Sequence, residues 1–161
     1  MFRIGFGFDT HKLSPDVPFF LGGILIPHSK GAIGHSDGDT LIHAIIDALL
    51  GAAGFSDIGT QYPDTEDAFK GIDSKILLQR SQSLVTSAGY QIGNIDTTIV
   101  LQIPKLQSMI PLMRECLASC LDIPVDRISV KAKTSEKLGF IGREEGVSAY
   151  AVVLLNKISP V

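Results

Sequence analysis

The stretch IGNIDTTIVLQ (residues 92–102), followed by PKLQSMIPLMRECLASCL (104–121) and RISVKAKT (127–134), indicates the fold class. The outer two pieces have the apolar pattern of strands, and the middle piece repeats apolar residues at helical spacing. A strand, a helix and a strand in this order predict a right-handed crossover between parallel strands. The sequence therefore predicts an α/β (α+β) fold.

Three other stretches predict strands. FRIGFGFDTH (2–11) alternates, and PFFLGGILIPHS (18–29) has the character of a second strand with a bend at its Gly-Gly pair, so we expect a hairpin between them. VSAYAVVLLNKI (147–158) predicts the last strand.

The clearest predicted helix is SDGDTLIHAIIDALLGAAGF (36–55), whose apolar residues recur at helical spacing. Ser36 or Asp37 is available as its N-cap, and Gly51 lies near its end.

A second helix is predicted for DSKILLQRSQSLVTSAG (73–89), with Asp73 as cap and Gly89 as stop. The stretch before it, SDIGTQYPDTEDAFKG (56–71), is rich in Gly, Pro and Asp and predicts an ordered loop. Ordered loops of this kind often carry function.

The chain has 161 residues, enough for one domain with a substantial core and too few for two, so we predict a single domain over residues 1–161. The expected architecture is a layer sandwich, with a mixed four-stranded-type sheet and helices on one face. Apolar strands left uncovered on the other face would be costly in a monomer. Subunits are therefore expected to associate there.

Composition excludes several classes of partner. The formal net charge of −3 gives no field that would attract a nucleic-acid backbone or an anionic membrane. The N-terminal MFRIGFGFDT lacks the pattern of a secretory signal, and the apolar runs are too short to span a bilayer. The expected location is cytoplasmic, and a plastid stays open if a transit peptide has been removed.

Two cysteines, Cys116 and Cys120, lie four residues apart on a predicted helix. A disulfide between such neighbours has poor geometry, and a metal site would need more ligands nearby. We expect buried, reduced thiols.

Candidate metal ligands are Asp9, His11 and His43. The first two lie two apart at the end of a predicted strand, so their side chains leave the same face. Two imidazoles and one carboxylate suit zinc and leave one tetrahedral position open, as catalytic sites do. The alternative is that Asp9 is a turn residue and His43 a hydrogen-bonded core histidine, and the spacing alone does not decide between them.

The start of the 36–55 helix is a candidate anion site. His35 and Ser36 are expected to open this helix, where free N–H groups and the helix dipole favour negative charge. Asp37 and Asp39 in its first turn could simply favour helix initiation. Asp47 either orients the free ring nitrogen of the metal-binding histidine or is solvated.

Seven stretches, in the same order, resemble the cyclodiphosphate synthases of the non-mevalonate isoprenoid route over nearly the whole chain. They are GFGFDTHKL (5–13), LGGILIP (21–27), GHSDGDTLIHAIIDALLGAAG (34–54), DIGTQYPDT (57–65), FKGIDSK (69–75), GYQIGNIDTTIVLQIPKL (89–106) and VKAKTSEKLGFIGREEG (130–146). HSDGD followed by LxHA, and TSEKLGFxGR, are long and specific strings. They favour the metal interpretation of Asp9, His11 and His43.

The resemblance implies a homotrimer with active sites between subunits, and a zinc ion on Asp9, His11 and His43 of each chain. It assigns catalytic contacts to His35 and Thr134, and to Glu136 a magnesium or manganese ion on the substrate diphosphate. The implied substrate-binding residues are Asp9, Thr10, His11, His35, Ser36, Asp57, Ile58, Gly59, Tyr62, Pro63, Asp64, Thr65, Glu66, Leu101, Gln102, Ile103, Pro104, Lys105, Leu106, Gln107, Lys133, Thr134, Ser135, Glu136, Phe140 and Arg143. Within this set, residues 101–107 would enclose cytosine.

Four positions depart from the family pattern. Phe6 replaces a common His, Lys133 and Ser135 replace Thr, and Glu144 replaces Gly. Lys133 either assists anion binding or pairs with a surface carboxylate.

The implied reaction converts 4-diphosphocytidyl-2-C-methyl-D-erythritol 2-phosphate to 2-C-methyl-D-erythritol 2,4-cyclodiphosphate and CMP. The substrate's 2-phosphate attacks its own β-phosphate, so the enzyme is a metal-dependent phosphorus-oxygen lyase. Two alternatives remain at this stage. One is a zinc hydrolase that activates water, and the other is a trimeric module that only binds metal or an isoprenoid diphosphate.

Overall fold

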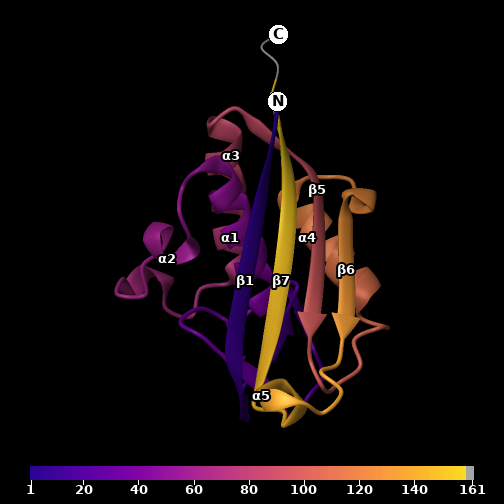
Figure 1. Cartoon of the computed structure of the whole chain (residues 1–161). Coiled ribbons are helices and arrows are strands. Elements are labelled where there is room, and N and C mark those ends of the chain that lie inside the picture. Colours follow the sequence, from indigo (N-terminus) through magenta and orange to yellow (C-terminus); the bar gives the residue numbers. More distant parts are fainter. Residues whose placement is uncertain (159–161) are drawn as a thin grey trace.

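A computed structural model describes residues 1–158 of the chain. Five strands form one mixed sheet in the order β4-β1-β7-β5-β6 (Figure 1). They are β1 (Phe2–Pro15), β4 (Lys30–Ile33), β5 (Tyr90–Val100), β6 (Ile128–Lys133) and β7 (Gly146–Lys157). The β5–β6 pair is parallel and the other pairs are antiparallel. Helix α4 (Ile110–Leu121) connects β5 to β6, so the predicted crossover and the α/β class are confirmed.

The predicted hairpin between 2–11 and 18–29 is wrong. The second stretch instead folds on itself as two short strands, β2 (Phe20–Leu21) and β3 (Ile24–Leu25). Gly22 and Gly23 both have positive φ, 62° and 79°, which reverses the chain between these strands. Strand β1 pairs with β7 and with β4, which is the fifth strand that the sequence reading lacked.

Helix α1 (Thr40–Ala53) lies directly on β1. A Cβ atom on Gly5 would sit 1.8 Å from the carbonyl oxygen of Ala48, and one on Gly7 would sit 1.9 Å from that of Ala44. These contacts leave no room for any side chain at the two glycines. The helix backbone is thereby held against the N-terminal half of the strand.

The N-cap of α1 is Asp39, not Ser36 or Asp37 as expected. Its Oδ1 accepts hydrogen bonds from the N–H groups of Ile42 at 3.0 Å and of Gly22 at 2.9 Å, and its Oδ2 accepts one from Gly23 at 2.6 Å. A single buried carboxylate therefore starts the helix and anchors the β2–β3 turn. It follows that His35 and Ser36 precede the helix and do not open it.

The second predicted helix is confirmed as α3 (Ser74–Ser87), which begins after its cap Asp73 and ends just before Gly89. The loop expected before it contains two short helical turns, α2 (Ile58–Gln61) and η1 (Asp67–Phe69). The remaining short elements are η2 (Val125–Arg127) and α5 (Gly139–Gly142).

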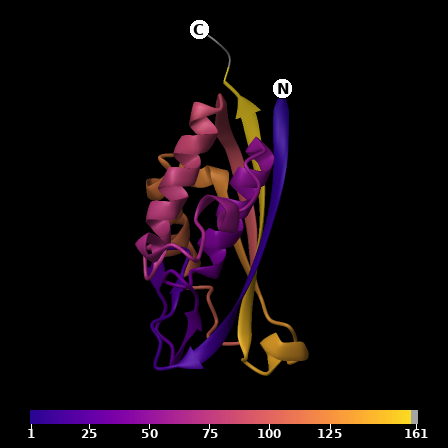
Figure 2. The same ribbon diagram turned by 90° about the vertical axis from the view of Figure 1, so that its left-hand side faces the viewer.

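The three long helices α1, α3 and α4 cover one face of the sheet (Figure 2). Helix α1 supplies more of the largest fully buried side chains than any other element, among them Leu41, Ile45 and Leu49. The predicted layer sandwich with helices on one face is confirmed.

The opposite face of the sheet is bare along most of its length, with α5 at one end (Figure 2). Large apolar side chains project from it, and we call these residues the open face: Phe2, Ile4, Phe6, Phe8, Tyr150 and Val152. They alternate with helix-facing residues on β1 and β7, as the strand period requires. The expected association of subunits at this face stays a prediction.

Cys116 and Cys120 are free, half-buried thiols on α4. Their sulfur atoms approach the carbonyl oxygens of Gly23 and Lys75. Among residues 1–158, no helix is long and apolar enough to cross a membrane.

Candidate functional site

The side chains of Asp9 and His11, both on β1, meet the side chain of His43 near the N-terminal end of α1. On β1 these two ligand candidates continue the helix-facing row that begins with Gly5 and Gly7. The Oδ2 atom of Asp9 lies 2.9 Å from Nδ1 of His11 and 3.1 Å from Nδ1 of His43. One possible ligand atom from each of the three residues lies within 4.8 Å of the other two. The structure therefore brings the predicted triad together.

The electrostatics of this triad favour a bound cation. Burial alone would raise the pKa of Asp9, but the two adjacent imidazoles outweigh it and lower the pKa to about 2. Burial opposes a charge on His43, yet its hydrogen bond to Asp9 and the negative charge there raise its pKa. Nδ1 of His11 is buried and has no partner with hydrogen-bond geometry, although Asp9 is close. Two imidazoles and a carboxylate arranged in this way fit a zinc ion.

The other side of the His43 ring contacts two serines. Nε2 lies 2.9 Å from Oγ of Ser36 and 2.9 Å from Oγ of Ser74. Asp47 does not orient this ring, because its Oδ1 instead accepts the N–H of Ile58 at 2.8 Å. Of the two alternatives for Asp47, the one in which it orients the imidazole is therefore wrong.

A cavity of about 320 Å³ opens in front of the triad. We call it the metal cavity, and its lining comprises Asp9, His11, His35, Ser36, His43, Ile58, Gly59, Tyr62, Asp64, Phe69 and Leu77. Phe69 and Leu77 were missed by the sequence reading. Both are apolar and carry no chemical signal in the sequence. In the structure the Phe69 ring packs edge-on against Tyr62, with ring centroids 5.5 Å apart.

Several predicted substrate residues near this cavity do not line it. Asp57 caps α2 by accepting the N–H of Thr60 at 2.8 Å, while Pro63, Thr65 and Glu66 lie in the same loop. Thr10 points to the opposite side of β1, where its hydroxyl lies 2.7 Å from that of Ser148.

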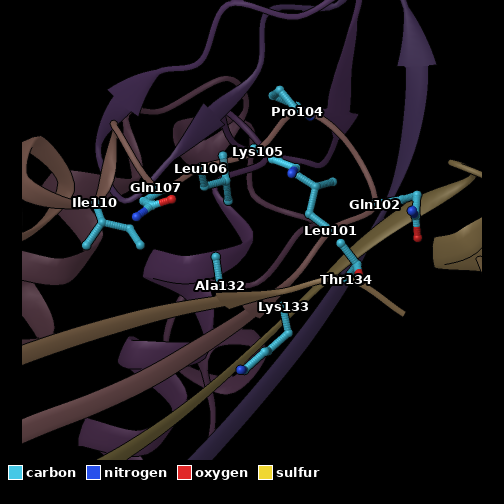
Figure 3. A pocket seen from close by; sticks show the side chains of 10 residues that line it. All are labelled: Leu101, Gln102, Pro104, Lys105, Leu106, Gln107, Ile110, Ala132, Lys133 and Thr134. Atoms are coloured by element: carbon cyan, nitrogen blue, oxygen red, sulfur yellow. The ribbon is translucent and has the colours of Figure 1, made fainter. Parts of the chain in front are cut away.

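A second cavity of about 250 Å³ lies between the end of β5, the start of α4 and the end of β6. We call it the 101–107 cavity, and Figure 3 shows its lining: Leu101, Gln102, Pro104, Lys105, Leu106, Gln107, Ile110, Ala132, Lys133 and Thr134. Ile103 is exposed and outside this lining, whereas Ile110 and Ala132 were not predicted. The two cavities share no lining residue.

The segment after β6 turns sharply beside the 101–107 cavity. Glu136 and Lys137 both have positive φ, 52° and 64°. The Thr134 hydroxyl donates to Oε1 of Glu136 at 2.9 Å, and the Lys137 N–H donates to the side chain of Gln102 at 3.1 Å. Glu136 is therefore held at this cavity and is not part of the Asp9 triad.

Two further predicted residues follow on α5 and just beyond it. Phe140 is exposed, and the Arg143 guanidinium donates two hydrogen bonds to the carboxylate of Glu145, at 2.9 and 3.0 Å. Both lie at the end of the sheet where β7 begins.

A model of the YgbB family matches residues 2–156. The chain belongs to the YgbB family. The YgbB relatives include proteins named 2-C-methyl-D-erythritol 2,4-cyclodiphosphate synthase. One from Porphyromonas gingivalis is 59% identical over 154 residues, covering 96% of this chain and 95% of its own length. Another, from Bacteroides fragilis, is 56% identical over 156 residues, covering 97% and 98%. The resemblance carried by the sequence motifs is thus confirmed.

Solved structures show the same YgbB fold. The bifunctional IspDF from Campylobacter jejuni matches with a TM-score of 0.95 and 42% identity, and the match covers 99% of this chain but 43% of that longer one. The CDP complex of IspF from Plasmodium falciparum has a TM-score of 0.87 and 35% identity, covering 98% and 97%. A synthase in its CDP-bound form has a TM-score of 0.89 and 40% identity, covering 96% and 100%.

The structure also places the four positions that were expected to depart from the family pattern. Phe6 belongs to the open face, Ser135 donates to the carbonyl of Leu138, and Glu144 contacts Lys30. Lys133 makes no ion pair within residues 1–158, and its side chain extends away from Leu106 and Gln107 (Figure 3).

Proposed function

We propose that this chain converts 4-diphosphocytidyl-2-C-methyl-D-erythritol 2-phosphate to 2-C-methyl-D-erythritol 2,4-cyclodiphosphate and CMP. The chain is a lyase of isoprenoid biosynthesis, because that is the activity denoted by the name 2-C-methyl-D-erythritol 2,4-cyclodiphosphate synthase, which its relatives carry. The observation that carries the proposal is the Asp9, His11 and His43 triad at the metal cavity. Residues 1–161 act as one domain, and the cytoplasmic location stays a prediction.

The reaction forms one bond and breaks one. An oxygen of the substrate's 2-phosphate attacks the β-phosphorus, and the bond from this phosphorus to the oxygen shared with the α-phosphate breaks. CMP leaves with that oxygen. The nucleophile is already an anion and needs no general base. The protein must hold the phosphates in line and offset their negative charge.

Asp9, His11 and His43 would hold one zinc ion per chain, and Glu136 would hold magnesium or manganese on the diphosphate. Such ions supply Lewis-acid polarisation of phosphoryl oxygens. The lone exposed carboxylate of Glu136 is a sufficient protein contribution for magnesium, which usually keeps several waters and uses phosphate oxygens.

Hydrogen-bond donors at the two cavities complete the proposed site. His35 and Ser36 line the metal cavity, and Thr134 lines the other, so each can donate to phosphoryl oxygens as charge builds up on them. Residues Leu101 to Gln107 would enclose the cytosine, which agrees with CDP being bound by two of the similar structures. Asp57 to Gly59, and Tyr62 to Glu66, would hold the ribose and the methylerythritol portion. Phe140 and Arg143 would complete the set beside β7.

We further propose a homotrimer whose active sites are shared between chains. Two observations support it. One is the apolar open face, and the other is that the triad lines one cavity while Thr134, the hydrogen-bond partner of Glu136, lines another cavity of the same chain. In such an assembly the metal cavity of one chain would face the 101–107 cavity of its neighbour.

The test is a product assay on metal-stripped protein, with zinc and magnesium restored separately and together in ¹⁸O-labelled water. We expect CMP and the cyclic diphosphate, without the label, only when both ions are present. Label in CMP or in the sugar phosphate would instead indicate a zinc hydrolase. No release of CMP by metal-replete protein would favour a binding module.

Glu136→Gln separates the two ions. It removes the charge but keeps the size, so we expect bound zinc to be unchanged while the magnesium concentration for half-maximal rate rises about tenfold, because a carboxylate ligand is lost. Glu115→Gln, on the exposed side of α4, is the control. An unchanged magnesium profile would remove Glu136 from the site, and loss of zinc would mean that the two ion sites are coupled.

A further inference from the structure

Behind His43, away from the cavity, lies a buried polar group that the proposed mechanism does not use. Ser74, the first residue of α3, is fully buried, and its Oγ is 2.9 Å from Nε2 of His43. Asp37 holds this serine at two points: its Oδ1 accepts the Ser74 hydroxyl, and its Oδ2 accepts the Ser74 N–H at 3.0 Å. Helices α1 and α3 lie side by side (Figure 2).

Asp37 is itself fixed. Its N–H donates to the carbonyl oxygen of Ile72 at 3.1 Å, and its Oδ1 also accepts the N–H of Asp39 at 3.2 Å. The carboxylate therefore sits in a frame of backbone hydrogen bonds that joins the start of α1 to the start of α3.

The direction of these hydrogen bonds determines where the imidazole proton lies. A carboxylate only accepts, so the proton between Ser74 and Asp37 belongs to the serine hydroxyl. The lone pairs of Ser74 Oγ then remain for Nε2 of His43, which must be the donor. A bound ion would replace the proton of the hydrogen bond between Nδ1 and Asp9, and the neutral imidazole, with its proton on Nε2, would then have its lone pair on Nδ1.

We propose that Asp37 and Ser74 are positioning residues that hold His43 with its proton on Nε2 and its Nδ1 lone pair aimed at the metal position. A metal-bound histidine usually donates its second N–H to a carboxylate or another acceptor, which fixes the ring and raises its basicity. Here the carboxylate acts through one serine hydroxyl.

Ser36 is the competing partner, because its Oγ is also 2.9 Å from Nε2. It has no carboxylate of its own, and it lines the metal cavity. Its hydroxyl also lies 3.2 Å from that of Ser74, so with the proton on Nε2 the Ser36 hydroxyl can donate to Ser74 or into the metal cavity. The fixed acceptor is therefore Ser74, and Ser36 is left to face a ligand.

The test measures zinc affinity by chelator competition, and the His43 tautomer by ¹⁵N NMR of zinc-loaded protein with labelled histidine. Ser74→Ala and Asp37→Asn should each lower zinc affinity by about 10- to 100-fold, the usual loss when such an outer partner is removed. Both should also change the nitrogen shifts or N–H exchange of His43. Ser74→Thr keeps the hydroxyl and should restore most of the affinity.

Two controls separate this role from a structural one. Asp73→Ala removes the exposed cap of α3 and weakens the same helix without touching His43, so its zinc affinity should stay within about twofold of the unchanged protein, as outer-partner losses are far larger. Ser36→Ala should lower the affinity less than Ser74→Ala does. If Ser74→Ala does not fold, Asp37→Asn and Ser74→Thr give the answer.

Unchanged zinc affinity and unchanged His43 signals in Asp37→Asn, or a larger loss for Ser36→Ala than for Ser74→Ala, would overturn the inference. The inference rests on the proposed zinc site, and His43→Ala distinguishes the two. If that variant keeps its zinc, the site itself is wrong. If it loses zinc while Asp37→Asn and Ser74→Ala keep it, only the positioning role fails.

Discussion

His43 is the residue on which the metal triad depends, because its ring bridges Asp9 on β1 and Ser74 at the start of α3. Without this ring, Asp9 and His11 would be the two remaining protein ligands for zinc. Known catalytic zinc sites have three. The Asp9 carboxylate would also lose one of the two imidazoles that lower its pKa to about 2.

We therefore expect His43→Ala to lose its bound zinc and to lower turnover at least about a hundredfold, as expected when a Lewis acid worth several kcal/mol is lost. Elemental analysis and the product assay measure the two effects. His28→Ala is the matched control, since His28 lies in the loop between β3 and β4, outside the triad. Full zinc content in His43→Ala would refute the ligand assignment.

The thiol of Cys120 gives a pH-dependent prediction. Burial first, and then the negative charges of Cys116 and Asp73, raise its pKa to about 11. The fold thus favours the neutral thiol. The contribution of Cys120 to the free energy of unfolding is constant below about pH 8.5. Above that pH the unfolded cysteine loses its proton while the folded one keeps it, so this contribution falls as the pH rises toward 11.

Because the thiolate is the reactive form, native Cys120 should react with iodoacetamide at pH 8 more than about tenfold slower than in unfolded protein. Mass spectrometry of the alkylated peptide measures both rates. The alkylation rate of a short cysteine peptide, whose thiol is fully exposed, is the reference for both rates. Equal rates in the two states would contradict the buried environment.

Among the elements, α1 and α3 could be predicted from sequence because their apolar spacing is local. The cap of α1 could not. Asp39 becomes the cap because it also binds the N–H groups of Gly22 and Gly23, which lie 17 and 16 residues away, and no local pattern indicates that contact. Strand β4 was missed for the same reason, since four residues gain strand character only by pairing with β1.

The site divides in a similar way. Asp9 and His11 could be paired from their spacing, whereas the arrival of His43 needs α1 to lie on the glycines of β1. Phe69 and Leu77 carry no chemical signal and are assigned to the cavity only by the fold.

We expect a large effect for Asp39→Ala, because this carboxylate caps α1 and also binds the N–H groups of Gly22 and Gly23. Loss of the cap costs about 1 kcal/mol, and each buried N–H left unpaired adds about 1–3 kcal/mol, so we expect the free energy of unfolding to fall by at least about 3 kcal/mol. Urea unfolding measures it. Asp73 caps α3 through a single exposed N–H, that of Lys75. Asp73→Ala should therefore cost only about 1 kcal/mol. Equal costs for the two variants would contradict the anchoring role of Asp39.

On the scale of the whole molecule, the open face predicts association. Light scattering should give about three times the chain mass of 17.3 kDa. Phe6→Asp places a charge on this face, where Phe6 is 63% exposed in the single chain, and should shift the mass toward one chain while the circular dichroism stays native.

Leu112→Asp is the matched control, because Leu112 is also exposed, at 51%, but lies on α4 on the helical side. It should leave the mass unchanged. A mass of one chain for the unsubstituted protein would count decisively against shared active sites.

The pairing of β1 with β7 also has a consequence for protein synthesis. Residues 2–12 pair with residues 146–156, so the centre of the sheet cannot close until the ribosome has made both. At ~5–20 residues per second, β1 waits roughly 7 to 30 s with its phenylalanines unpaired. During that interval the nascent chain presents an aggregation-prone strand, and holdase chaperones would act there. Slow codons between residues 12 and 146 would lengthen the wait, so codon choice in this span should affect the yield of folded protein.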